Sequence, residues 1–248
     1  LFMLSSQYEI KNGIAVIPDG EKIIESSLFF FCTDLTSVII PSSVIEIGNG
    51  AFACCTRLSS IAIPDSVTII GDNAFRDCTG LTSVVIPDSV TEIGEYAFIG
   101  CTRLTSIVIP SSVTKIGKCA FEGCTGLTSI VVSEGNEVYD SRNNCNAIIE
   151  TSSNTLIRGC QNTVVPDTVT EIEWHAFENC SGLTSVVIPD SVKKIWECAF
   201  EGCTGLTSIV VSEGNKVYDS RNNCNAVIET SIDEMIKGCQ NTVIPDTV

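Results

Sequence analysis

The sequence predicts a solenoid of the α/β class that is mostly β, in which one short structural unit is stacked on its own copies. From Pro18 to Pro110 the proline of an Ile-Pro pair recurs every 23 residues, and a phenylalanine column and a cysteine column keep the same step. Self-similarity at a period of roughly 20 to 50 residues is typical of stacked repeats. We therefore expect residues 1–248 to form a single solenoid of about ten turns.

The first half of one turn is illustrated by residues 81–87. Leu81, Val84 and Ile86 end in an apolar alternation, which predicts a short strand that faces the core. Pro87 ends this strand because proline has no N–H group to donate to a neighbouring strand. Equivalent strands of successive turns are then expected to run parallel, about 4.8 Å apart.

The second half of the turn runs from Asp88 to Cys101. Val90 and Ile93 predict a second, shorter inward-facing segment. Gly94 ends that segment, either with a positive φ or where two backbones approach closely. The Ala97-Phe98 pair is expected to pack inward from a short helical or 3₁₀ stretch.

The phenylalanines and cysteines that share one place in each turn are expected to form core columns. Free cysteine is among the most buried residue types, so we favour a ladder of thiols over disulfide bridges. A metal site is less favoured because the chain has no Cys-x-x-Cys motif and only one histidine, His175. The core columns comprise Phe52, Phe75, Phe98, Phe121, Phe177, Phe200, Cys55, Cys78, Cys101, Cys124, Cys180 and Cys203.

Two longer turns, at 133–165 and 212–244, interrupt the period, and each is expected to carry a β-hairpin. Residues 133–151 recur at 212–230 with only two differences. In the first copy the polar cluster Asp140, Arg142, Asn143 and Asn144 has two interpretations. It could contact a glycan or a cation, or its side chains could cap backbone groups in a tight loop, and we favour the second.

Charge and hydropathy narrow the possible partners. The net charge is −16, with 30 acidic residues against 14 lysines and arginines, which disfavours nucleic acid and anionic membranes as partners. No stretch of 18 uncharged apolar residues is present, so no membrane span is expected. The sequence stops within a repeat, at residues 244–248, and we expect it to be a fragment of a longer chain.

The unit Leu-Thr-Ser-Val-Val-Ile-Pro-Asp-Ser-Val-Thr-Glu-Ile-Gly-x-x-Ala-Phe-x-x-Cys, as at 81–101, resembles the BspA-like (Treponema-type) class of leucine-rich repeats. The resemblance covers nearly all of the chain from about residue 14 onward. It implies a right-handed solenoid with a parallel sheet on one face, and helical or 3₁₀ turns and second short strands on the other. It also implies a bacterial or protist protein at the cell surface or secreted, with a role in adhesion.

A strip of small, uncharged residues on the outward face of the predicted sheet is the candidate binding surface. The structural alternative is that β-branched residues are there only because they favour strands. The strip comprises Ser60, Ala62, Ser83, Val85, Ser106, Val108, Ser129, Val131, Ser185, Val187, Ser208 and Val210.

These features favour a non-enzymatic recognition or adhesion module that binds host or bacterial proteins. The alternative is an inert stalk that spaces another domain from the cell envelope, which near-identical turns would suit. An enzyme is the least favoured class, because Ser-His-Asp or Cys-His chemistry would have to use His175. We expect that residue to lie exposed or half-exposed on a helical stretch, and we expect no catalytic residue, cofactor or metal.

Overall fold

The computed structural model describes residues 8–246 and 248, which fall into two compact units. The first unit comprises the described residues up to Leu127 together with Val132–Val138. The second comprises Thr128–Val131 and Tyr139–Val248. Each unit is a stack of short turns and is described by itself, so the single solenoid over 1–248 stays a prediction.

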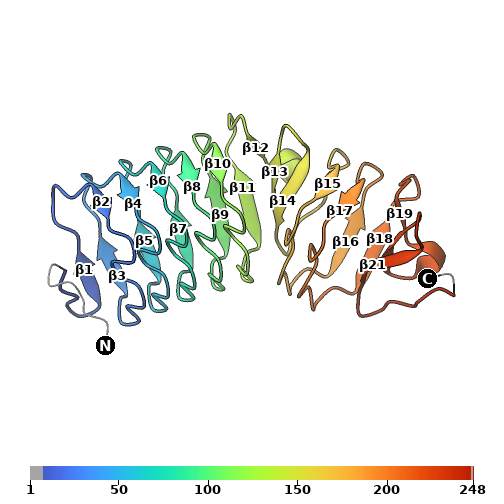
Figure 1. The fold of residues 1–248 in the computed structure, drawn as a ribbon, viewed down its shortest axis with the longest axis horizontal. Coiled ribbons are helices and arrows are strands. Elements are labelled where there is room, and N and C mark those ends of the chain that lie inside the picture. Colours follow the sequence, from blue (N-terminus) through green and yellow to red (C-terminus); the bar gives the residue numbers. More distant parts are fainter. Residues whose placement is uncertain (1–7, 247) are drawn as a thin grey trace. The chain divides into compact units, whose positions relative to one another are not determined.

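In the first unit, each turn contributes one strand to each of two parallel strand systems (Figure 1). One system pairs β1 with β3 and β5 with β7, and the other is a five-stranded sheet in the order β10-β8-β6-β4-β2. Its strands are β1 (Ile14–Val16), β2 (Ile23–Ile24), β3 (Ser37–Ile39), β4 (Glu46–Ile47), β5 (Ser60–Ala62), β6 (Ile69–Ile70), β7 (Ser83–Val85), β8 (Glu92–Ile93), β9 (Ser106–Ile109) and β10 (Lys115–Ile116).

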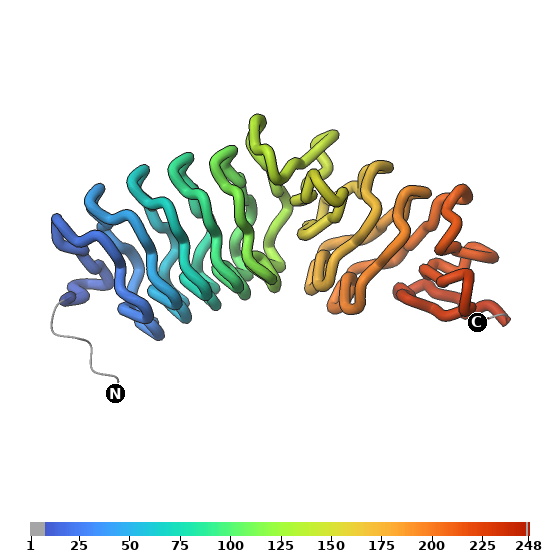
Figure 2. The backbone as a smooth tube through the Cα atoms, turned by 45° about the horizontal axis from the view of Figure 1, so that its top comes forward, coloured from blue at the N-terminus to red at the C-terminus, as the bar shows by residue number. Residues whose placement is uncertain are grey.

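The second unit combines the same turns with two antiparallel hairpins, β13–β14 and β20–β21 (Figure 2). Parallel pairing resumes between β14 and β15, β15 and β17, and β16 and β18. The elements are β12 (Tyr139–Asp140), η1 (Arg142–Asn144), β13 (Ala147–Glu150), β14 (Thr155–Gly159), β15 (Glu171–Ile172), β16 (Ser185–Ile188), β17 (Lys194–Ile195), β18 (Ser208–Val211), β19 (Tyr218–Asp219), η2 (Arg221–Asn223), β20 (Ala226–Glu229) and β21 (Glu234–Gly238). Strand β11 (Ser129–Val132) is divided between the two units.

The inward-packing Ala-Phe stretch consists of turns where the sequence suggested a short helix. Tyr96, directly before Ala97, has a φ of 57°, which breaks any helical run. The N–H groups then alternate between two kinds of acceptor. Ala97 donates within its turn to Gly94 at 3.4 Å, and Phe75 donates to Ala97 of the next turn at 2.7 Å. Lateral hydrogen bonds of this kind tie each turn to the next.

The phenylalanine column is a continuous stack in the first unit. The rings of Phe52, Phe75, Phe98 and Phe121 lie 5.1–5.4 Å apart between centroids and within 6–11° of parallel. Phe98 is fully buried, so both ring faces and its edges are covered by protein. In the second unit Phe177 and Phe200 stack in the same way at 5.0 Å.

The glycine column marks close backbone approach, which is one of the two alternatives that the sequence left open. Gly94 does not have a φ in the left-handed region, but a Cβ built on it would lie 2.5 Å from the amide nitrogen of Asp72. Gly117 would meet the backbone of Glu95 in the same way. A side chain at this place would therefore hold two turns apart.

The column cysteines are unbridged thiols, and each lies next to the phenylalanine column. Cys78 Sγ donates to the carbonyl oxygen of Phe52 at 3.1 Å, and Cys203 donates to that of Phe177 at 3.1 Å. Burial raises the pKa of the Cys78 and Cys203 thiols to about 12. These two thiols are therefore neutral at physiological pH.

These thiols predict a loss of stability in alkali. Unfolded thiols lose their protons near pH 9.0, whereas Cys78 keeps its proton to about 12. Above the unfolded value the unfolded state binds fewer protons, so the free energy of unfolding falls as pH rises. We expect a loss of about 1 kcal/mol per protected thiol at one pH unit above that value. Urea unfolding between about pH 8 and about pH 10 measures it. Cys78→Ala should show a shallower decline, and a decline equal to that of the parent chain would contradict the assignment.

Candidate recognition surface

The outward side chains of the longer strands form an uncharged strip in each unit. In β7, Ser83 and Val85 are exposed while Val84 between them is buried. The register places Ser60 beside Ser83 and Ala62 beside Val85. Like residues therefore form two parallel rows along the stack.

Side chains of the predicted strip are exposed in both units, except that Ser129 and Ser208 are half-buried. In the second unit, Val187 of β16 pairs in register with Val210 of β18. The members in the first unit are Ser60, Ala62, Ser83, Val85, Ser106 and Val108, and those in the second unit are Ser129, Val131, Ser185, Val187, Ser208 and Val210.

Strands β1 and β3 extend the strip in the first unit to residues that the sequence prediction omitted. Val16 is 54% exposed and Ile39 is 56% exposed, and their strands pair in register. Both lie in the same column as Ala62, at steps of 23 residues, so continuing the column toward the N-terminus would have found them. With Val85 at 76% and Val108 at 52%, the apolar row covers five consecutive turns.

A row of threonines lies directly before the strip and supports its backbone. Thr82 Oγ1 donates to the carbonyl oxygen of Ser59 at 3.2 Å, and Thr207 Oγ1 donates to that of Thr184 at 3.1 Å. These hydroxyls therefore bind the preceding turn. A partner on this face would meet methyl groups and serine hydroxyls, with the strand backbones already committed to their ladders.

The polar cluster of the first long turn forms an internal brace. Asp140 also caps a backbone group, as the structural interpretation predicted, because its Oδ1 accepts the N–H of Arg142 at 3.1 Å. Arg142 binds Asp140 at 2.7 Å, and it donates to Asn154 at 2.7 Å across the hairpin. The hydrogen bond from Arg142 to Asp140 raises the pKa of the guanidinium. Asn143 and Asn144 have φ values of 58° and 53°, which asparagine tolerates in tight loops. The second copy repeats the brace with Arg221 and Asp219 at 3.0 Å.

His175 is half-buried in a turn, so the expected helical setting is wrong. Its φ is 58°, close to the 57° of Tyr96 at the same place of another turn. Its Nδ1 lies 2.7 Å from Glu178 Oε2. The carbonyl oxygen of His175 accepts from the buried Arg158 guanidinium at 3.0 Å. These contacts hold the hairpin β13–β14 against the following turn.

Comparisons with known proteins identify a family of repeats. A model described as "BspA type Leucine rich repeat region (6 copies)" matches residues 8–128 and 150–245. The search of curated proteins gave no match. Among the residues that the structure describes, no helix is long and apolar enough to cross a membrane.

Three solved bacterial structures resemble the chain. A leucine rich cell surface protein from Faecalibacterium prausnitzii is 40% identical with a TM-score of 0.68, and the match covers 79% of this chain and 54% of that one. The leucine rich repeat protein of T. pallidum is 27% identical with a TM-score of 0.53, over 81% of this chain and 87% of that one. The pneumococcal vaccine antigen PcpA, 20% identical with a TM-score of 0.62 over 82% and 62% of the two chains, shares the fold.

Proposed function

Because the chain belongs to the BspA-type leucine-rich-repeat family, we propose that it is a non-enzymatic recognition module that binds proteins through its exposed strip. The observation that carries this proposal is the row of exposed apolar side chains in the first unit. Val16, Ile39, Val85 and Val108 are each more than half exposed, on a chain with a net charge of −16. Repeat proteins of this kind bind partners through extended surfaces.

The chemistry of the strip favours a flat, uncharged protein surface as the partner. Apolar side chains that become covered contribute about 25 cal/mol per Å² of buried apolar area. Small side chains also let the partner approach closely along several turns. Serines at the alternate positions supply hydroxyl groups that can satisfy polar groups at the rim of a contact.

A location at the cell surface or in the secreted fraction is part of the same proposal. It is supported by the family and by the cell surface protein of Faecalibacterium prausnitzii, of which this chain spans 54%. We propose host matrix proteins or proteins of other bacteria as the partners. A role of the whole protein in adhesion would follow from its binding to such partners.

Two glutamates in the strip test the proposal. Val85→Glu with Val108→Glu places two charges on the contact surface, and we expect binding to an array of matrix proteins and bacterial cells to weaken at least about 10-fold, which corresponds to about 1.4 kcal/mol. The matched control is Ser42→Glu with Ser111→Glu, which adds the same charge in exposed turns where Asp65 stands in another repeat. Equal binding by the two double variants would remove the strip from consideration.

An inert stalk is the alternative function, and the same experiment distinguishes it from a recognition module. Near-identical turns, such as residues 133–151 and 212–230 with only two differences, favour a spacer over a selective surface. A stalk would bind no component of the array, and the strip variants would leave every measured property unchanged.

A further inference from the structure

Three neighbouring backbone N–H groups in the second unit have no acceptor among the described residues. In a regular pair of turns, Gly50, Phe52 and Cys54 donate to the carbonyl oxygens of Asp72, Ala74 and Arg76 of the next turn, at 2.7–2.8 Å. The equivalent donors at the C-terminal end of the second unit belong to Cys198, Phe200 and Gly202. None of these three N–H groups donates a hydrogen bond to a backbone acceptor among the described residues.

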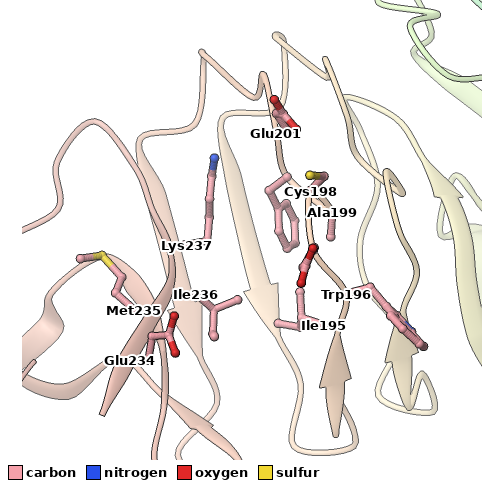
Figure 3. A pocket seen from close by; sticks show the side chains of 11 residues that line it. Ile195, Trp196, Cys198, Ala199, Glu201, Glu234, Met235, Ile236 and Lys237 are labelled. Atoms are coloured by element: carbon pink, nitrogen blue, oxygen red, sulfur yellow. The ribbon is translucent and has the colours of Figure 1, made fainter. Parts of the chain in front are cut away.

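The cause is the long turn at 212–244, which places a hairpin where a regular turn would lie. The parallel ladder ends at β17. There the N–H of Ile195 donates to the side-chain hydroxyl of Tyr218 at 2.9 Å instead of to a backbone carbonyl of a further strand. The hairpin strand β21 then faces the turn at 195–201 across a groove of about 370 Å³. Figure 3 shows the two walls of this groove, with Lys237 on the hairpin side and Cys198 and Glu201 on the turn.

The groove is acidic. Glu197, Glu201 and Glu234 line it against the single ammonium of Lys237, which gives a net charge of −2 if the carboxylates are ionised (three negative charges less one positive). Cys198 lies beside Glu201, and its thiol donates to that carboxylate, which raises the pKa of Cys198. Below these groups, the half-buried side chains of Ile195 and Ile236 supply apolar surface.

We propose that this groove binds an extended, lysine- or arginine-bearing peptide segment of a partner protein. Its backbone carbonyls at i, i+2 and i+4 would accept from Cys198 and Phe200, which line the groove, and from Gly202 directly beyond it. Addition of an extended segment to open backbone groups is a common mode of peptide recognition. The carboxylates favour lysine and arginine side chains, since hydrogen bonds between charged groups are stronger than those between neutral groups. The groove is separate from the strip, so the two proposals stand or fall independently.

The probe is the peptide acetyl-Val-Lys-Val-Lys-Val-amide, with acetyl-Val-Glu-Val-Glu-Val-amide as its anionic counterpart. Titration is followed by amide chemical shifts of the ¹⁵N-labelled chain. We expect the cationic peptide to shift the resonances of the amides of residues 198, 200 and 202 and to protect these amides from hydrogen exchange. The anionic peptide should bind at least about 10-fold more weakly, and added salt should lower the affinity for the cationic peptide.

Cys198→Tyr is the blocking variant, because it fills the groove at a place where Tyr96 stands in a regular turn with nearly the same backbone, φ 57° against 55°. The matched control is Asn73→Tyr, at the same place of another turn and also with a φ of 55°. We expect the first to reduce cationic peptide binding at least about 10-fold and the second to leave it unchanged.

Several outcomes would overturn the proposal. They are equal binding of the two peptides, unchanged binding to Cys198→Tyr, and undisturbed amides of 198, 200 and 202 at millimolar peptide. If these amides become protected from hydrogen exchange as the protein concentration rises, without any peptide, the groove binds a second copy of the chain instead.

Discussion

Phe98→Ala is expected to lower the free energy of unfolding by about 3–5 kcal/mol, the range for removing a large buried aromatic side chain. The ring is fully buried and stacks on both sides, at 5.1 Å from Phe75 and 5.4 Å from Phe121. Its loss leaves a cavity that two turns must share, and it also removes two aromatic contacts. Urea unfolding followed by circular dichroism measures the change.

Phe30→Ala is the matched control for that experiment. This ring is 50% exposed and lies outside the stacked column. We expect its removal to cost less than about 1 kcal/mol, since substitutions at exposed sites have small effects. Equal losses for the two variants would mean that a ring in the stacked column contributes no more to the free energy of unfolding than an exposed ring.

Gly94→Ala is expected to cost about 3 kcal/mol, at the upper end of the range for overpacking. The new Cβ would lie 2.5 Å from Asp72 N and 2.5 Å from Gly71 C, and both are backbone atoms that cannot rotate away. The gain of about 0.4–1 kcal/mol from a less flexible unfolded chain is too small to offset this clash.

Gly20→Ala separates this clash from backbone strain. Gly20 has a φ of +97° and no heavy atom within 4 Å of a built Cβ, so alanine there meets strain alone. We expect a cost of about 1–2 kcal/mol at Gly20. If Gly94→Ala unfolded at the same urea concentration as the parent chain, the two turns would not be in backbone contact.

Most of the fold could be predicted because the same side chain recurs at the same place in every turn. Phe98, Cys101 and Val84 each repeat at 23-residue steps, and the period alone assigns them to the core. Gly50 and Asn73, at the same place of earlier turns, indicate the left-handed backbone at Tyr96, but tyrosine and cysteine also occupy that place and do not favour a positive φ. The turns therefore replaced the expected helical stretch.

The two binding surfaces differ in how far the sequence predicts them. The strip follows from strand alternation, and the omitted Val16 and Ile39 follow from the same column. The groove at 195–201 does not, since the open N–H groups of Cys198 and Phe200 depend on where the hairpin β20–β21 lies. Its position is set by contacts between distant segments, such as that of Tyr218 with Ile195.

Backbone hydrogen bonds from each turn to the next are the central structural claim. An NMR experiment that correlates an amide nitrogen with the carbonyl carbon across a hydrogen bond tests them directly. We predict correlations from Phe75 to Ala97 and from Asp77 to Ile99, whose donors and acceptors lie 2.7 Å apart. Correlations confined to residues of the same turn, or to acceptors other than the residue 22 positions further along the chain, would contradict the stacked repeat.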